Sequence, residues 1–273
     1  GMTFVLLTGG IDISVASIVA FTGVFAAFLL EKGWAAAPVI ALTLFIGAFV
    51  GFLQGYAVHE FKIAPFLITL AGQFLMRGMC AVVSTISIPI TNDFFKSAAL
   101  AKISWVTASG SRPKLYYYVF FAIAIVIIAW YILRFTRFGR AVYAVGSNEQ
   151  SAQYMGLNVK GVKVGVYAIN GFCSALGGIL FSFYTLAGYS LQNMGMELDA
   201  ISSAVIGGTL LTGGVGTVIG SMVGVLIQGI IQTIVTYQNL NTWWTKVTIA
   251  AILCFFIVIQ RLIAIRAEKD KAA

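Results

Sequence analysis

Long apolar stretches without charged side chains alternate with short charged segments along the chain. Residues 13–30, 33–58, 115–133, 164–196 and 200–245 contain no Asp, Glu, Lys or Arg. About 20 apolar residues are enough for a helix to cross a bilayer. Dividing the stretches at charges, Gly and Pro predicts eight membrane-spanning helices, at about 13–30, 39–56, 64–83, 116–133, 164–187, 198–212, 217–236 and 243–260. We therefore expect an all-α polytopic membrane protein, with residues 1–273 forming a single transmembrane domain.

The opening residues Gly1–Leu7 are also apolar, but they are too short to cross a membrane and lack the basic start of a signal peptide. We expect them to be the end of a further helix, in a chain truncated at its amino terminus. The two halves of the chain share a layout, which predicts two structurally repeated halves. Gly9–Ser14 opens one helix and Glu197–Ser202 opens another. The helix after each opening carries glycines at four-residue spacing, predicted to pack closely against a neighbouring backbone; they are Gly47, Gly51, Gly55, Gly216, Gly220 and Gly224.

Charge and composition exclude several classes of protein. With 60% hydrophobic and 10% charged residues, the chain is too apolar for a water-soluble globule. In a membrane protein Lys and Arg concentrate in cytoplasmic loops and so set its orientation. We therefore attribute the net charge of +8 to membrane orientation rather than to nucleic-acid binding. Residues 134–163 and the tail after residue 260 are both rich in Lys and Arg, so both are predicted to be cytoplasmic. Four predicted helices separate them, the even number that this topology requires.

The same count places residues 84–115 outside, although Lys96, Lys102, Arg112 and Lys114 face only Asp93 there. Aromatic side chains prefer the membrane interface, and several fall at the expected outer side. These are Trp34, Trp105, Tyr116 to Tyr118, Trp243 and Trp244.

Three acidic residues near predicted helix starts, Asp12, Glu197 and Asp199, are the main chemical candidates. An acid at membrane depth costs free energy and often marks a solute pathway, whereas an acid at a helix start also caps backbone N–H groups. Both interpretations stay open. A sugar pathway would need neutral donors and acceptors as well, and we assign a candidate substrate path to Asp12, Ser14, Asn170, Glu197 and Asp199.

Several expected signatures of chemistry are absent. The sequence contains no Gly-x-x-x-x-Gly-Lys-Ser/Thr loop, so it should not bind ATP by the P-loop route. Cys80, Cys173, Cys254 and the single His59 have no metal-ligand spacing, and no catalytic constellation for an intramembrane enzyme is evident. If transport is driven, its energy should come from another subunit, and we expect no cofactor and no metal on this chain.

The loop at 134–163 carries a specific resemblance. Residues 146–157, Gly-Ser-Asn-Glu-Gln-Ser-Ala-Gln-Tyr-Met-Gly-Leu, resemble the cytoplasmic coupling loop of ABC-transporter permeases. In that family a short helix here docks into a groove on the ATPase subunit. The family commonly has paired alanines, of which the first is Ser151 here. The resemblance assigns ATPase coupling to Gly146, Asn148, Glu149, Ala152 and Gly156.

The likeness covers essentially the whole chain. Gly9–Ser14, Phe138–Gly146, Glu197–Ile201 and Gly207–Gly214 resemble the ribose-type monosaccharide permeases, although Ala16-Ser17 stands where that family commonly has Gly-Ser. Within that group, four short segments look most like the permease for galactofuranose. They are Leu70-Ala71-Gly72, Ser87-Ile88-Pro89-Ile90, Gly188-Tyr189 and Trp243-Trp244-Thr245-Lys246.

The resemblance implies an ABC importer transmembrane subunit of about ten helices when complete, with about eight and a remnant here, in the bacterial cytoplasmic (inner) membrane. It implies an ABC ATPase subunit that binds ATP and Mg, a second permease subunit in a homo- or heterodimer, and an extracytoplasmic sugar-binding protein, all beside membrane lipid. A permease for ribose, another sugar or branched-chain amino acids remains an alternative, as does a passive channel.

Overall fold

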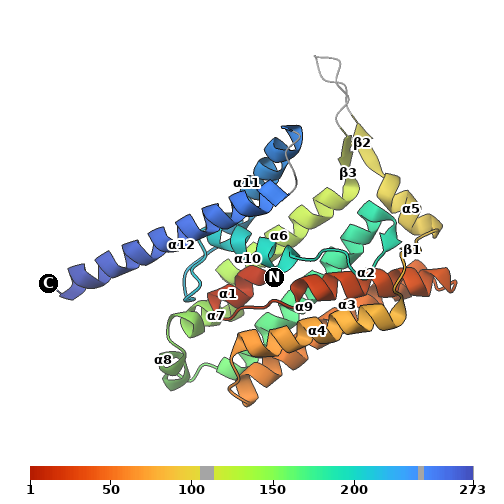
Figure 1. Cartoon of the computed structure of the whole chain (residues 1–273). Helices are drawn as coiled ribbons and strands as arrows, with labels where there is room; N and C mark the ends of the chain where they lie inside the picture. Colours follow the sequence, from red (N-terminus) through yellow and green to blue (C-terminus); the bar gives the residue numbers. More distant parts are fainter. Residues whose placement is uncertain (105–113, 239–242, 273) are drawn as a thin grey trace.

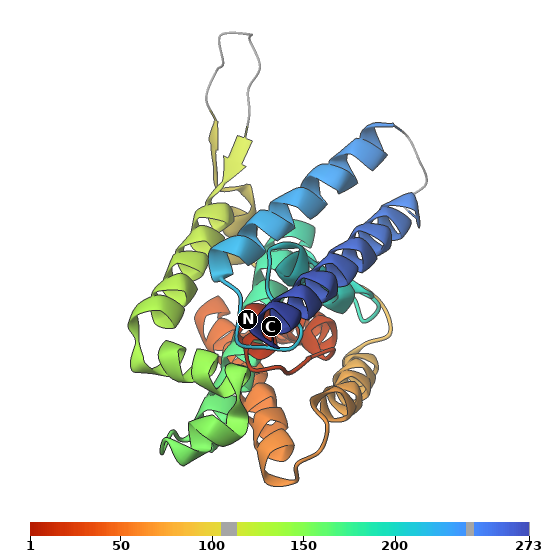
Figure 2. The same ribbon diagram turned by 90° about the vertical axis from the view of Figure 1, so that its left-hand side faces the viewer.

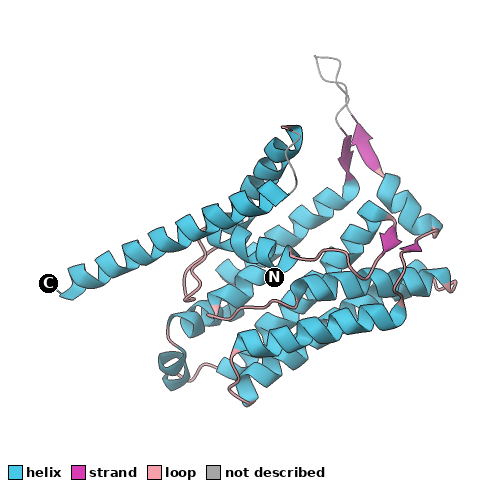
Figure 3. Cartoon of the chain, in the orientation of Figure 1, coloured by secondary structure: helices cyan, strands magenta, loops and turns pink. Residues whose placement is uncertain are grey.

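The computed structural model describes residues 1–104, 114–238 and 243–272. Helices make up most of the described chain, and four short strands form two small antiparallel pairs (Figure 3). The elements are α1 (Met2–Leu7), α2 (Val15–Glu31), α3 (Ala36–Glu60), α4 (Pro65–Val83), β1 (Ile88–Pro89), α5 (Asp93–Leu100), β2 (Lys102–Ser104), β3 (Lys114–Tyr116), α6 (Tyr117–Phe135), α7 (Arg137–Ser147), α8 (Glu149–Tyr154), α9 (Val159–Thr185), β4 (Ala187–Gly188), α10 (Met196–Ile206), α11 (Val218–Tyr237) and α12 (Trp243–Ala272).

Among the described residues, five helices are long and apolar enough to cross a membrane: α3, α4, α6, α9 and α11. The shorter apolar helix α2 and the part of α12 from 243 to 259 match two more of the eight expected segments. The expected span at 198–212 is wrong. α10 has 11 residues and ends at Ile206, so it is about 16 Å long, roughly half the thickness of the hydrocarbon layer.

The end of α10 follows from the glycines that succeed it. Gly208, Gly213 and Gly214 all have positive φ angles, which interrupt a right-handed helix, and α11 begins only at Val218. Gly216 also has a positive φ and lies before α11. The expectation that Gly216, Gly220 and Gly224 share one helix is therefore wrong for Gly216.

A similar unit opens the chain. α1 has six residues, all of them buried, and it is followed by Thr8-Gly9-Gly10, an extended segment and α2. α10 is likewise followed by a loop that contains Thr212-Gly213-Gly214, and then by α11. The structural counterpart of residues 9–14 is therefore the loop before α11. The expected match to residues 197–202 is wrong, because those residues lie inside α10.

The core is built around α9, which packs against α2 and α3 (Figures 1 and 2). A Cβ added at Gly47, Gly51 or Gly55 of α3 would meet the backbone or side chains of α9. Where these glycines lie, the two backbones approach more closely than any other residue would allow. Gly220 and Gly224 of α11 lie in the same way against the backbone of α10. These contacts replace the hydrophobic drive that lipid does not supply.

The elements β1, α5, β2 and β3, between α4 and α6, lie at the opposite end of the helices from α8 (Figure 1). β1 pairs with β4, which joins this segment to the end of α9, and β2 pairs with β3. The opposite placement agrees with the sequence-based assignment of residues 84–115 and 134–163 to different sides of a membrane. Trp105 and Arg112 lie outside the described residues.

Replacing Gly51 with Ala should destabilise the α3–α9 contact. The new Cβ would overlap the backbone of Tyr167, and overpacking of this kind costs about 1–3 kcal/mol. Thermal unfolding in detergent should show a lower midpoint for Gly51→Ala. Gly78→Ala is the matched control, because its Cβ would meet open space in α4. Equal midpoints for the two variants would contradict the close contact.

Candidate functional site

Side-chain caps shape the segment that connects α6 to α9. Thr136 accepts a hydrogen bond from the Gly139 N–H and begins α7 (3.1 Å). Asn148 ends α7 and accepts a hydrogen bond from the Ser151 N–H, which begins α8 (2.8 Å). Asn158 caps α9 by accepting from Gly161 N–H (2.8 Å). Each cap replaces a missing partner of a helix start, so three helices follow one another with little loop between them.

The five residues assigned to coupling have different positions in this segment. Asn148 is a cap, Ala152 is fully buried in an apolar cluster with Val159, and Gly156 ends α8 with a φ of +78°. Glu149 forms an exposed ion pair with Lys163 of α9 (2.7 Å). Gly146 lies on α7 against the backbone of Leu7. Asn148, Ala152 and Gly156 thus shape and anchor the segment.

The end of α8 and the residue after it carry two large exposed side chains that the sequence analysis did not single out. Tyr154 is 89% exposed and Met155 is 69% exposed, and they adjoin each other at the end of the helix. Two large apolar side chains in a polar loop were the available signal. Exposed apolar groups at such a tip are typical of a surface that another protein covers.

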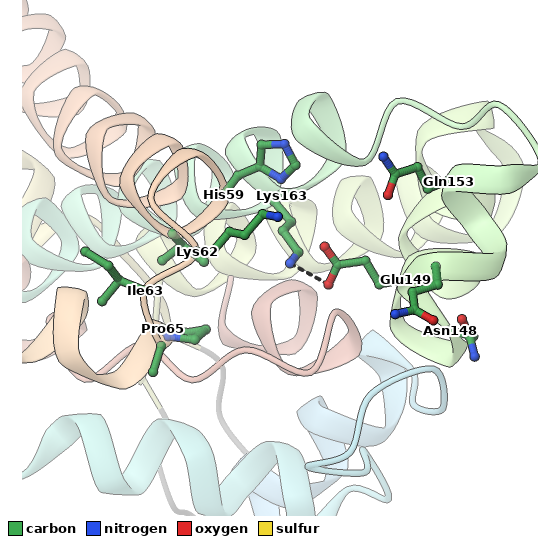
Figure 4. A pocket seen from close by; sticks show the side chains of 11 residues that line it. His59, Lys62, Ile63, Pro65, Asn148, Glu149, Gln153 and Lys163 are labelled. Carbon is green, nitrogen blue, oxygen red and sulfur yellow. Dashed lines mark hydrogen bonds and ion pairs between the residues drawn. The ribbon is translucent and has the colours of Figure 1, made fainter.

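A polar cavity of about 780 Å³ lies beside α8. Its walls are α8, the start of α9 and the turn between α3 and α4 (Figure 4). Lys163 points across it towards Glu149. His59, in the last turn of α3, and Lys62, in the turn after it, line the same space, and Lys62 is held at a φ of +52°. A second ion pair, Lys160 with Glu60 (2.6 Å), joins the start of α9 to the end of α3.

A buried polar network surrounds Asp12. One carboxylate oxygen accepts hydrogen bonds from the Ser14 N–H (2.8 Å) and hydroxyl (2.6 Å), and the other accepts from the Asn170 amide of α9 (2.7 Å). The Gln54 amide of α3 donates to the Ser14 hydroxyl (2.9 Å). Asp12, Ser14 and Asn170 are almost wholly buried. Asp12 thus fixes the non-helical segment between α1 and α2 to α9, and through Ser14 to α3.

Glu197 and Asp199 lie away from this network. Both occupy the first turn of α10, where negative charge complements the helix dipole. Glu197 accepts a hydrogen bond from Gln73 of α4 (3.3 Å), while its other oxygen is buried without a partner among the described residues. Asp199 and Asn170 both line a cavity of about 390 Å³ between α1, α2, α9, α10 and α11. The five candidate path residues therefore fall into one buried group and two acids on α10.

No group of three His, Cys, Asp or Glu side chains is placed to hold a metal ion within the described ranges. Cys80, Cys173 and Cys254 are all free thiols.

The chain matches the family model described as "Branched-chain amino acid transport system / permease component" over residues 1–257. It is 43% identical over 276 residues to the inner membrane ABC transporter permease protein YjfF of Escherichia coli, covering 100% of this chain and 82% of the relative. It is 36% identical to the fructose import permease protein FruG of Bifidobacterium longum (96% and 78% covered). It is also 36% identical to the ribose import permease protein RbsC of Haemophilus influenzae (93% and 77% covered). No solved structure matches.

Replacing Asp12 with Ala should destabilise the fold much more than replacing it with Asn. Alanine leaves the Ser14 and Asn170 donors unpaired, at about 1–3 kcal/mol for each buried group. Asparagine keeps an oxygen for Ser14. Its amide can donate to the Asn170 oxygen once the Asn170 side chain turns over, because that oxygen has no partner among the described residues. Thermal unfolding in detergent compares the two variants. Equal loss in both would show that the charge of Asp12 is required.

Proposed function

Because this chain belongs to the branched-chain amino acid transport system permease family and is a sugar ABC importer permease subunit, we propose that it transports galactofuranose. As a permease, the chain is a multi-pass inner membrane protein and a translocation component without catalytic activity of its own. Its importer class implies an ATPase subunit and a binding protein as partners.

The α7–α8 segment carries the proposal that this chain is driven by an ATPase. It presents an exposed Tyr154–Met155 tip on a helix that is capped at its start and anchored through Ala152. A rigid, apolar projection of this kind suits a groove on a partner subunit. ATP and Mg are assigned to that ATPase, and no cofactor to this chain, which has no P-loop sequence.

The polar cavity beside α8 extends the proposed docking surface to the α3–α4 turn. Lys62 makes no ion pair within the described part of the chain, so its charge is available to a partner. Phe61, next to it, is 65% exposed. The proposed ATPase contact therefore combines an apolar tip with a basic turn.

The assignment of galactofuranose rests on the short segments that resemble that permease. Two of them, at residues 87–90 and 188–189, are joined in the structure, because Ile88 pairs with Gly188 in the β1–β4 ladder. Both lie at the end of the bundle away from α8, where a sugar delivered by a binding protein would enter (Figure 1). This placement supports the proposal, since a feature specific to one cargo belongs on the entry side.

Transport is proposed to follow alternating access in an assembly of two permeases, identical or different, with two ATPase domains. Binding-protein docking outside and ATP-driven closure of the ATPases inside would rock the helices about a central path. The candidate path residues remain Asp12, Ser14, Asn170, Glu197 and Asp199.

Uptake of radiolabelled sugars tests the proposed cargo. Cells that carry the complete permease, its ATPase and its binding protein should accumulate galactofuranose, and an inactive ATPase should abolish uptake. Uptake of ribose or branched-chain amino acids in its place would overturn the cargo. Uptake that ignores the ATPase would indicate a passive channel.

Replacing both Tyr154 and Met155 with Ser should weaken binding of the ATPase by about tenfold or more, because large side chains at an interface centre contribute about 2 kcal/mol. Membrane insertion should be unchanged, since both side chains are exposed. Co-purification of the ATPase at graded concentrations measures the loss. Tyr237→Ser is the matched control, since Tyr237 is 84% exposed at the end of α11, outside the α8 surface. Unchanged binding would place the docking surface elsewhere.

A further inference from the structure

Two Thr-Gly-Gly loops, far apart in the sequence, meet in the structure. One follows α1 at residues 8–10 and the other lies between α10 and α11 at residues 212–214. The Gly214 N–H donates a hydrogen bond to the Leu7 carbonyl at the end of α1 (2.8 Å). A Cβ added at Gly213 would lie 2.8 Å from the Gly9 nitrogen, so no side chain fits between the loops. The contact is therefore backbone against backbone.

The end of α7 is the third member of this contact. A Cβ added at Gly146 would overlap the Leu7 carbonyl oxygen and lie 2.7 Å from the Gly214 nitrogen. A Cβ at Gly214 would lie 2.7 Å from the Ser147 hydroxyl. One turn earlier, the Tyr143 hydroxyl donates to the Gly216 carbonyl (2.7 Å). α7 therefore contacts the ends of both repeated units directly before it leads into α8.

This arrangement has a mechanical consequence. Asn148 ends α7 and begins α8, so α8 is joined to Gly146 without an intervening flexible loop. Each loop lies in the connection between a short helix and a long one, α1 and α2 or α10 and α11. A flexible side chain could absorb a small displacement by changing its rotamer, but a contact between backbones transmits it.

We propose that this junction, made by Gly146 of α7 and the loops 8–10 and 212–214, transmits movement of α8 to both repeated halves of the chain at once. The inference rests on the proposed function, because it assumes that an ATPase moves α8. Gly146, Gly213 and Gly214 are then positioning residues of transport. They contact no solute, and they keep the loops 8–10 and 212–214 in contact with α7, which leads into α8.

The first test measures ATP hydrolysed per sugar imported by the complete transporter in proteoliposomes. Gly146→Ala and Gly213→Ala should raise this ratio at least about fivefold, the lower end of usual coupling between sites. Two glycines with no atom near an added Cβ provide matched controls. Gly229→Ala matches the helical Gly146, and Gly208→Ala, with a φ of +89°, matches the strain of Gly213 at +87°. Both controls should keep the parent ratio.

Tyr143→Phe tests the proposed junction if the glycine variants do not assemble. It removes the hydrogen bond to Gly216 without adding an atom, and it should raise the ratio about twofold to tenfold, the equivalent of one hydrogen bond. A structural defect alone would lower hydrolysis and uptake together and leave the ratio at the parent value. That result in Tyr143→Phe and in the assembled glycine variants would overturn the junction.

A second readout is independent of the cargo. Thr8→Cys and Thr212→Cys, each in a chain whose three native cysteines are replaced by Ala, can be labelled with a thiol reagent with and without ATP and vanadate. Both positions should change their labelling rate in the parent, and Gly146→Ala should suppress the change at both. A response at only one position, or at neither, would overturn the junction even where sugar uptake is normal. Labelling changes at both positions without galactofuranose uptake would overturn the proposed cargo and support the proposed junction.

Discussion

The need to satisfy every backbone group inside the protein governs this fold more than any other constraint. In hydrocarbon an unpaired N–H or C=O costs several kcal/mol, so a helix can be broken only where other parts of the protein supply partners. Within the described residues, glycine-containing loops follow the two short helices α1 and α10. Asp12 satisfies Ser14 in the first break, and the Gly214 to Leu7 hydrogen bond joins the second break to the first. The two breaks thus support each other.

The long helices follow from the sequence because one property, uninterrupted apolar length, determines them. α3, α4, α6, α9 and α11 all fall within a few residues of the predicted segments. The segment at 198–212 is also largely apolar, yet its only helix among the described residues is the end of the short α10. Composition could not reveal this, because the break depends on the backbone angles of Gly208 and Gly213. The same limit applies to the repeat: hydropathy and spacing align residues 9–14 with 197–202, whereas in the structure the Thr-Gly-Gly loops define the shared unit.

In the candidate site, too, the sequence predicts some of the residues and only the structure reveals the others. Sequence resemblance located the α8 segment, but it singled out residues that build the segment, such as the cap Asn148 and the buried Ala152. Residues that keep a shape leave a recognisable motif, while the exposed Tyr154 and Met155 can be found only once the helix is oriented. The sequence makes Asp12 a candidate as an acid near a predicted helix start, and its partner Asn170 lies 158 positions away. Nothing local in the sequence indicates that pairing.

α9 links these parts mechanically. Its first turn is paired with α8 through Lys163 and Glu149 and with α3 through Lys160 and Glu60, and its middle holds Asp12 through Asn170. α3 and α9 also contact each other along the three glycines of α3, where their backbones are too close for a side chain to lie between them. Movement of other helices relative to α3 and α9 is then most easily accommodated in two connections. One joins the short helix α1 to α2, and the other joins the short helix α10 to α11. α7 contacts both connections, at Leu7 and at Gly214. A movement of α7 therefore acts on the parts of the chain that are free to move.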